Sequence, residues 1–227
     1  LLNLLKPDLV HFPHFNVPII FGGKFVVTIH DLIHQHFQMR RVTTHDPITY
    51  KIKQLGYRAV FRTAIRRSVK ILVPSNFVKD LLINEWRVNK DKIAVTYEAV
   101  DDKILATANI MGKKKIASVM KKFSIRQPYI FYVGNAHPHK NLEGLIKAFL
   151  KLKESHKNLT LVLSGGDHYF WQRLKRENQQ SGINFTGFVS DEELVALYKG
   201  AEMFVQPSFE EGFGIPLLEA MACSTPV

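Results

Sequence analysis

The sequence predicts an α/β fold of two domains, each built on a parallel sheet. In both halves of the chain, short apolar runs rich in β-branched residues alternate with amphipathic helical stretches. A polar, lysine-rich stretch at 101–127 lies between the halves and predicts an interdomain connection. We therefore expect a first domain at 1–105, a linker at 106–127 and a second domain at 128–227.

The first half contains the strands and helices expected of such a domain. Its strand-like runs lie between Pro and Gly residues, and a long stretch of helical periodicity separates the second run from the third. Ser75 is placed to cap a helix that begins at Asn76, because a serine hydroxyl accepts hydrogen bonds from the first free amides. We predict strands at 8–12, 25–30, 70–75 and 92–100, and a helix at 47–70.

The second half repeats the same alternation after a helix expected at about 113–123. Ser190 or Asp191 is an ordinary cap for its next-to-last helix. We predict strands at 129–134, 159–166, 183–187 and 202–208, and helices at 141–154, 168–180, 191–200 and from 215 onward.

Composition limits the class of protein. Lys and Arg exceed Asp and Glu by 31 − 20 = 11, which favours anionic partners. The phenylalanines fall in predicted cores and not in a basic stacking motif, which argues against nucleic-acid binding. The single cysteine, Cys223, excludes an internal disulfide framework and fits a reducing compartment. No apolar run reaches the roughly 18–20 residues of a membrane span, and the N-terminal residues lack the features of a signal peptide.

Unusual residues follow three strands of the second half, those that end near residues 133, 186 and 206. In a parallel sheet, ligands bind at the carboxyl ends of the strands, where loops meet helix N-termini. Gly134 and Asn135 open the loop after the strand at 129–134, and Lys140 lies just before the next helix. An ammonium group beside free helix amides is a natural phosphate site, although a solvated lysine is the commoner explanation of such a residue.

The motif after the last strand, GFGIPLLE at 212–219, lies between two glutamates. Gly212 and Gly214 leave backbone amides open to a ligand, but Leu217 stands where a dinucleotide fingerprint has its third glycine. If the helix begins at 215, Glu211 and Glu219 can face one cleft, and carboxylates accept the paired hydroxyl groups of sugars and ribose. The alternative is that Glu211 interacts with the helix dipole and that Glu219 is a surface acid. The apolar residues around Glu219 in the sequence argue against a surface position.

Five segments, in order, resemble the retaining glycosyltransferases of family 4, which have the GT-B fold. FEEGFGIPLLEAMACSTPV resembles the family signature, including two glutamates separated by seven residues. LLKPDLVHFPH, VVTIHDLI, YVGNAHPHKNLEGLIKAF and FTGFVSDEELVALYKGAEMFVQPS resemble further family segments. The resemblance spans nearly the whole chain and is closest to the branch of surface-polysaccharide and lipopolysaccharide synthesis, often mannosyltransferases. It implies two Rossmann-like domains facing across a cleft, both incomplete in this chain.

The resemblance also implies roles for individual residues. Lys140 would neutralise the donor diphosphate, Glu211 would bind the hydroxyls of the transferred sugar, and Glu219 would bind the ribose. His30 would face the sugar from the opposite domain, and Val189 would lie near the base. The implied backbone contacts to sugar and diphosphate come from Phe213, Gly214 and Ile215.

One position departs from the family pattern. Many relatives carry Arg as a second diphosphate cation where this chain has Asn135. His137 and His139 lie close in the sequence, but a neutral imidazole does not replace a permanent charge. Diphosphate contacts other than that of Lys140 are therefore an open question.

We expect catalysis without a metal ion or any cofactor other than the nucleotide sugar co-substrate. His30, Asp31, His34 and His36 have spacings that are weak evidence for a zinc site. No D-x-D triplet is present, which argues against the metal–diphosphate clamp of the other large glycosyltransferase fold.

A row of arginines on the helix at 47–70 leaves two interpretations open. Arg58, Arg62 and Arg66 recur every four residues, while another face is shared by Tyr57, Val60, Phe61 and Ala64. The row is either a solvated cationic face or a surface that docks on anionic lipid or on a lipid-diphosphate acceptor.

Together these features predict a hexosyltransferase that moves mannose or glucose from GDP-mannose or a UDP-hexose to a glycan or lipid-linked acceptor, with retention at the anomeric carbon. A nucleotide-sugar binding protein without turnover and a paired-carboxylate glycosidase are the alternatives. We expect a cytoplasmic protein that associates peripherally with the inner face of the cell membrane. We also expect the chain to begin mid-protein, since it lacks an initiator Met.

Overall fold

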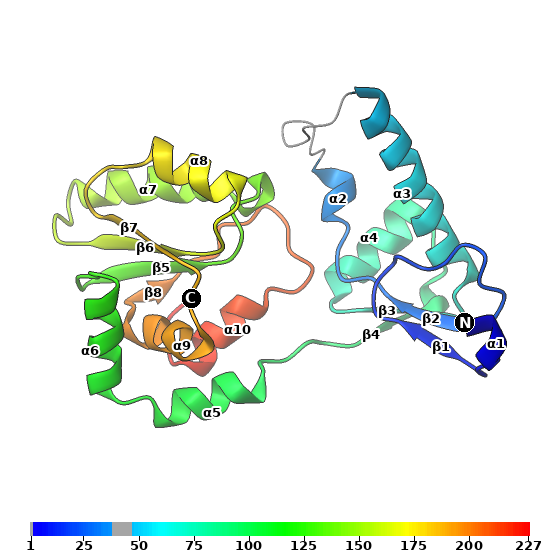
Figure 1. Ribbon diagram of the computed structural model, residues 1–227, viewed down its shortest axis with the longest axis horizontal. Helices are drawn as coiled ribbons and strands as arrows, with labels where there is room; N and C mark the ends of the chain where they lie inside the picture. Colours follow the sequence, from blue (N-terminus) through cyan, green and yellow to red (C-terminus); the bar gives the residue numbers. More distant parts are fainter. Residues whose placement is uncertain (1, 38–46) are drawn as a thin grey trace. The chain divides into compact units, whose positions relative to one another are not determined.

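The computed structural model describes residues 2–37 and 47–227, which form two compact units. The first unit comprises Leu1–Glu98 with Glu211–Phe213, and the second comprises Ala99–Glu210 with Gly214–Val227. Each unit contains a four-stranded parallel sheet (Figure 1), which confirms the predicted α/β class. Within residues 2–37 and 47–227, none of the helices combines the length and the hydropathy that a membrane span requires.

The first unit is built on a sheet in which the strands follow their sequence order, β1-β2-β3-β4. The strands are β1 (Val10–Phe12), β2 (Phe25–Thr28), β3 (Lys70–Val73) and β4 (Ile93–Val95). The helices are α1 (Leu2–Leu5), α2 (Ile33–His36), α3 (Pro47–Arg67) and α4 (Asn76–Trp86), followed by the 3₁₀ turn η2 (Lys90–Lys92).

Apolar residues of the predicted strands and of the long helix form the core of this unit. Val27 of β2, Ile71 of β3, and Phe61 and Ala64 of α3 are completely buried in it. Burial of such side chains stabilises the unit by about 1.5–3 kcal/mol for each large one. Ser75 caps α4 as predicted, because its Oγ accepts a hydrogen bond from the backbone N–H of Val78 (3.2 Å).

The second unit is built on a sheet with the strand order β7-β6-β5-β8. The strands are β5 (Tyr129–Val133), β6 (Thr160–Ser164), β7 (Ile183–Gly187) and β8 (Met203–Phe204). The helices are α5 (Asp102–Ile110), α6 (Lys113–Lys122), α7 (Leu142–Lys153), α8 (Tyr169–Glu177), α9 (Asp191–Gly200) and α10 (Ile215–Ala222), with the 3₁₀ turn η3 (Pro138–Lys140) before α7.

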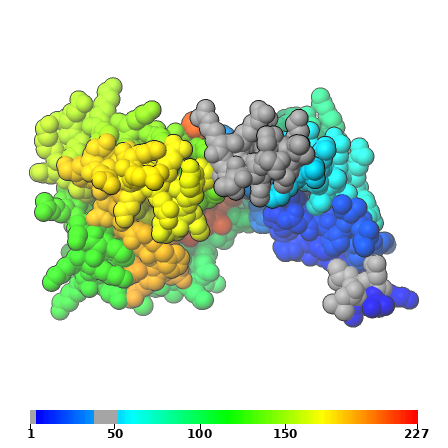
Figure 2. Space-filling model, turned by 45° about the horizontal axis from the view of Figure 1, so that its top comes forward, coloured from blue at the N-terminus to red at the C-terminus, as the bar shows by residue number. Residues whose placement is uncertain are grey.

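Helices cover both faces of the second sheet, so its central strand reads as a continuous apolar run. Tyr129 and Phe131 of β5 face the core that contains α9 and α10, whereas Ile130 and Tyr132 face the core under α7 and α8. The four side chains are nearly or completely buried. In the space-filling view (Figure 2), α8 forms part of the outer surface of this unit. Its first residue, Tyr169, is exposed.

The residues that we expected to be a linker, 106–127, belong to the second unit. They form the end of α5 and all of α6, and both helices pack against α9. Ala108 and Val119 are buried in the core of the unit. The polar, lysine-rich composition describes only the outer face of these helices, which is why the stretch resembled a connection.

The last strand is shorter than the expected 202–208. Only Met203–Phe204 pair as a strand, and the N–H of Val205 makes one further bond to the carbonyl of Phe131 (2.9 Å). Pro207 lacks a backbone N–H, so the ladder cannot continue past it.

Candidate functional site

Four loops leave the same edge of the second sheet, because its strands are all parallel. They follow β5, β6, β7 and β8 and contain most of the predicted donor-binding residues. Gly134 opens the first loop, and its N–H donates to the carbonyl of Ser164 at the end of the neighbouring strand (3.1 Å). This bond joins the first two loops at their origin.

Lys140 ends the short turn η3 immediately before α7. Its backbone N–H donates to the carbonyl of His137 (2.8 Å), and its side chain is half-buried. The N-terminal amides of α7 add positive potential next to the ammonium group. Lys140 therefore lies where the sequence predicted a site for a diphosphate.

Asn135 is exposed, and its side chain is used in the turn itself. Its Oδ1 accepts a hydrogen bond from the N–H of His137 (3.2 Å), while its carbonyl accepts one from the hydroxyl of Tyr132 (2.8 Å). The rings of His137 and His139 stack with centroids 5.9 Å apart, and His139 is only 5% exposed. Within this loop Lys140 is the side chain with a permanent positive charge.

A cavity of about 270 Å³ opens between the loops after β6 and β7. Gly165, Gly166 and Gly187 supply backbone to its wall, and Trp171 supplies a nearly buried aromatic face. The indole Nε1 has no hydrogen-bond acceptor among the described residues. The sequence analysis assigned no role to these residues, although two adjacent glycines at the carboxyl end of a parallel strand are the signal that could have revealed them.

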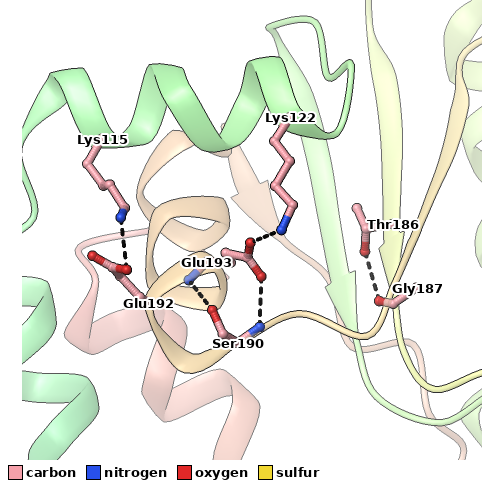
Figure 3. A network of polar contacts seen from close by, with 7 residues as sticks. All are labelled: Lys115, Lys122, Thr186, Gly187, Ser190, Glu192 and Glu193. Carbon is pink, nitrogen blue, oxygen red and sulfur yellow. Dashed lines mark hydrogen bonds and ion pairs between the residues drawn. The ribbon is translucent and has the colours of Figure 1, made fainter.

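Val189 precedes α9, in a segment that a capping box holds in place. The Ser190 Oγ accepts from the N–H of Glu193, and the Glu193 carboxylate accepts from the N–H of Ser190. Figure 3 shows that Lys122 of α6 also bonds Glu193, and that Lys115 pairs with Glu192 (2.9 Å). The hydrogen bond from Lys122 and those with Ser190 lower the pKa of Glu193, and the bond from Lys122 has the largest effect.

Helix α10 begins directly after Gly214, which has a left-handed backbone (φ +98°) that suits glycine. Glu219 lies one turn into the helix, half-buried, and the hydroxyl of the fully buried Tyr198 donates to its Oε2 (3.0 Å). Burial raises the pKa of Glu219 above its ordinary value. Because Tyr198 binds one oxygen, the carboxylate is oriented and its other oxygen can accept from a ligand.

We expect that Glu219→Gln leaves the protein at least as stable as the wild type at pH 7. The folded state holds the proton of Glu219 to a higher pH than the unfolded chain, so the contribution of Glu219 to the free energy of unfolding falls as the pH rises from about 4.5 through the raised pKa. Glutamine removes this loss while still accepting from Tyr198. Urea unfolding of both proteins at pH 4 and pH 7 measures the effect.

The control for this experiment is Glu202→Gln, which replaces an exposed carboxylate. We expect the gap between Glu219→Gln and wild type to widen from pH 4 to pH 7, whereas Glu202→Gln shows no such change. If the stability of Glu219→Gln relative to wild type is lower at pH 7 than at pH 4, burial does not penalise the charged carboxylate of Glu219.

His30 lies in the first unit, just after β2, and both of its ring nitrogens have partners. Nε2 donates to the carbonyl of Pro13 (3.0 Å), and Nδ1 lies 3.0 Å from Oε1 of Glu98. Glu98 was not expected from the sequence, since no motif marks it. Among residues 2–37 and 47–227, no three His, Cys, Asp or Glu side chains form a group that could hold a metal ion.

The signature motif is divided between the two units. Glu211 and Phe213 are grouped with the first unit, as is His30. Gly214, Ile215 and Glu219 belong to the second unit, together with Lys140, Gly134, Asn135 and Val189. The residues of the second group thus lie beyond the carboxyl ends of the strands of one sheet, whereas their joint binding of a donor and the joint action of Glu211 and Glu219 stay predictions.

The fold defines a protein of the two-sheet α/β class, in which most of the predicted donor-binding residues follow the carboxyl ends of the strands of one sheet. Residues 1–103 match the family model described as Glycosyltransferase Family 4, and residues 115–227 match the one described as Glycosyl transferases group 1. The chain belongs to this glycosyltransferase family, as its sequence motifs predicted.

Similar proteins agree with this membership. The chain is 31% identical to O-antigen chain mannosyltransferase B of Escherichia coli, over 98% of this chain and 56% of that protein. It is 32% identical to O-antigen chain mannosyltransferase RfbU of Salmonella typhimurium, over 93% and 57%. The chain thus spans somewhat more than half the length of these relatives.

Solved structures show the fold. HepE of Anabaena in complex with UDP-glucose superimposes with a TM-score of 0.75 at 18% identity, over 97% of this chain and 58% of that one. WaaG, a glycosyltransferase involved in lipopolysaccharide biosynthesis, gives a TM-score of 0.74 at 18% identity, over 100% and 60%. The expected GT-B fold is confirmed.

Proposed function

We propose that the protein is a retaining glycosyltransferase that moves a hexose from a nucleotide diphosphate sugar to a glycan or lipid-linked acceptor. The observation that supports this most strongly is the arrangement at the edge of the second sheet. There the turn that ends in Lys140 and the loop that leads into α10 follow neighbouring strands of one sheet, and the oriented carboxylate of Glu219 lies one turn into α10. A cation, free amides and a diol acceptor are what a nucleotide diphosphate requires.

The donor is GDP-mannose in this proposal, because relatives that match most of the chain are named mannosyltransferases. Glu219 accepts the ribose hydroxyls, and the backbone near Val189 and the glycine-lined cavity receive the nucleoside. Lys140 and the backbone amides of Gly214 and Ile215 bind the diphosphate, since Pro216 has no N–H and the N–H of Leu217 donates to the carbonyl of Gly214. Glu211 and the backbone of Phe213 bind the sugar, and His30 contacts it from the first unit.

Transfer proceeds on one face of the sugar. The bond between the anomeric carbon and the diphosphate oxygen breaks, and its electron pair stays on the diphosphate, where Lys140 stabilises the new charge. The acceptor oxygen bonds to the anomeric carbon from the same face, and its proton passes to the departing diphosphate. No protein carboxylate becomes covalently attached, and no metal ion takes part.

The test is a thermal-shift panel followed by transfer assays in EDTA. We expect GDP-mannose to raise the unfolding temperature more than UDP-glucose, UDP-N-acetylglucosamine or dTDP-rhamnose. Glu211→Gln should lower the rate of sugar transfer about 10²-fold or more, because the sugar hydroxyls lose a charged hydrogen-bond acceptor. NMR of the product determines its anomeric configuration.

Glu202→Gln is the matched control, since it replaces an exposed carboxylate of the second unit. An inverted product, or hydrolysis of simple glycosides without any nucleotide, would reject the proposal. Stabilisation by a donor without turnover with any glycan acceptor would instead indicate a nucleotide-sugar binding protein.

A further inference from the structure

The arginine row of α3 is exposed to solvent and lines a pocket. The pocket has a volume of about 460 Å³ and lies within the first unit, between α2, α3 and the end of α4. Arg58, Arg62 and Arg66 supply one wall, and His34 and His36 of α2 lie among the other lining residues. Phe61 and Ala64 of the same helix are buried in the core, which orients the arginines toward the pocket.

The pocket carries excess positive charge. Its acidic lining residue, Glu85, is bonded by the imidazole Nε2 of His36 (2.8 Å). No carboxylate within residues 2–37 and 47–227 forms an ion pair with Arg58, Arg62 or Arg66. Three guanidinium groups are therefore available to an anion from solution.

The shape and chemistry of the walls favour a small, discrete ligand. Guanidinium groups bind phosphoryl oxygens in pairs through a planar fork of donors. The side chains of Tyr57 and Trp86 add aromatic surface to the pocket. The ring centroids of Trp86 and the buried Phe61 are 4.6 Å apart. A concave site of this volume suits a compact ligand, such as a diphosphate with one attached group.

We propose that this pocket binds a diphosphate group carried by the acceptor. The inference deepens the proposed function and rests on it only for the identity of the ligand as the acceptor. The binding of a diphosphate here depends on the arginines alone. The row at Arg58, Arg62 and Arg66 thereby distinguishes a diphosphate-linked acceptor from a neutral glycan.

Titration calorimetry with inorganic pyrophosphate tests the proposal. The parent protein carries Lys140→Met, so that the proposed donor site does not contribute. We expect the additional double substitution Arg62→Gln/Arg66→Gln to raise the Kd for pyrophosphate about 10-fold or more. Arg62→Lys keeps the charge but loses the fork, so it should raise the Kd by less.

Arg176→Gln is the matched control, because it removes one exposed positive charge from α8 of the other unit. It should change the Kd by less than twofold. In the Lys140→Met parent protein, donor nucleotides do not report on the pocket. When Lys140 is intact, we expect the Arg62→Gln/Arg66→Gln protein to keep the thermal shift that GDP-mannose produces. If GDP-mannose produces no thermal shift even in the wild-type protein, the proposed function is rejected, and the pyrophosphate result still stands.

Two results would overturn the inference. One is a pyrophosphate Kd that the double substitution leaves unchanged. The other comes from sedimentation with vesicles of phosphatidylglycerol and phosphatidylcholine: if the double substitution abolishes vesicle binding but not pyrophosphate binding, the arginine row is a membrane-docking surface. Circular dichroism melts establish that each variant remains folded.

Discussion

Replacing Lys140 with Met is expected to slow sugar transfer by about 10²- to 10³-fold while leaving the protein folded. The ammonium group lies at the carboxyl edge of the second sheet, at the start of α7, where the leaving diphosphate gains charge in the proposed reaction. Methionine keeps the length and the apolar stem of the side chain but has no charge. The effect should fall on kcat more than on KM, because the charge increases as the bond breaks.

Lys147→Met is the control for this change, since Lys147 is an exposed residue of α7 itself. Steady-state rates with GDP-mannose as donor compare the two variants with wild type. A Lys140→Met enzyme within threefold of the wild-type kcat would show that Lys140 does not stabilise the leaving group. An imidazole has no permanent charge, so we do not expect His137 or His139 to replace the ammonium group fully.

Replacing Gly165 with Ala is expected to lower the free energy of unfolding by about 3 kcal/mol or more. A Cβ at this position would lie 2.3 Å from the carbonyl oxygen of Gly134 and 2.4 Å from the indole of Trp171. Both neighbours belong to packed parts of the second unit, so relief requires a shift of backbone and not only of a flexible side chain. The same shift would deform the loops that carry the proposed donor site.

The measurement is urea unfolding, with donor thermal shifts recorded on the folded fraction. Gly56→Ala makes the same chemical change in the interior of α3, where a Cβ would meet nothing within 4 Å. It should stabilise the protein by about 0.5–1 kcal/mol, because glycine lowers helix stability relative to alanine. If the two substitutions change the free energy of unfolding equally, then Gly134 and Trp171 can move away from a Cβ at position 165 without cost.

Several features could be predicted from short stretches of sequence because their causes are local. Alternating apolar runs and helical periodicity predicted the strands and helices, and Ser75 predicted the start of α4. Local composition also misled: the lysine-rich stretch before residue 128 is not a linker, because buried residues such as Val119 join it to the second core. Pro207 ended the last strand earlier than its apolar pattern suggested.

By itself, the sequence determined the α/β class, the order of the elements and the family, since these depend on periodicity and on motifs read along the chain. Only the tertiary structure revealed the bond from Tyr198 to Glu219, the close approach of Gly134 and Trp171 to Gly165, and the pocket along the arginine row. Each of these joins side chains or backbone from different elements of the chain. Such contacts are created when helices pack on a sheet, and no local pattern records which residues will meet.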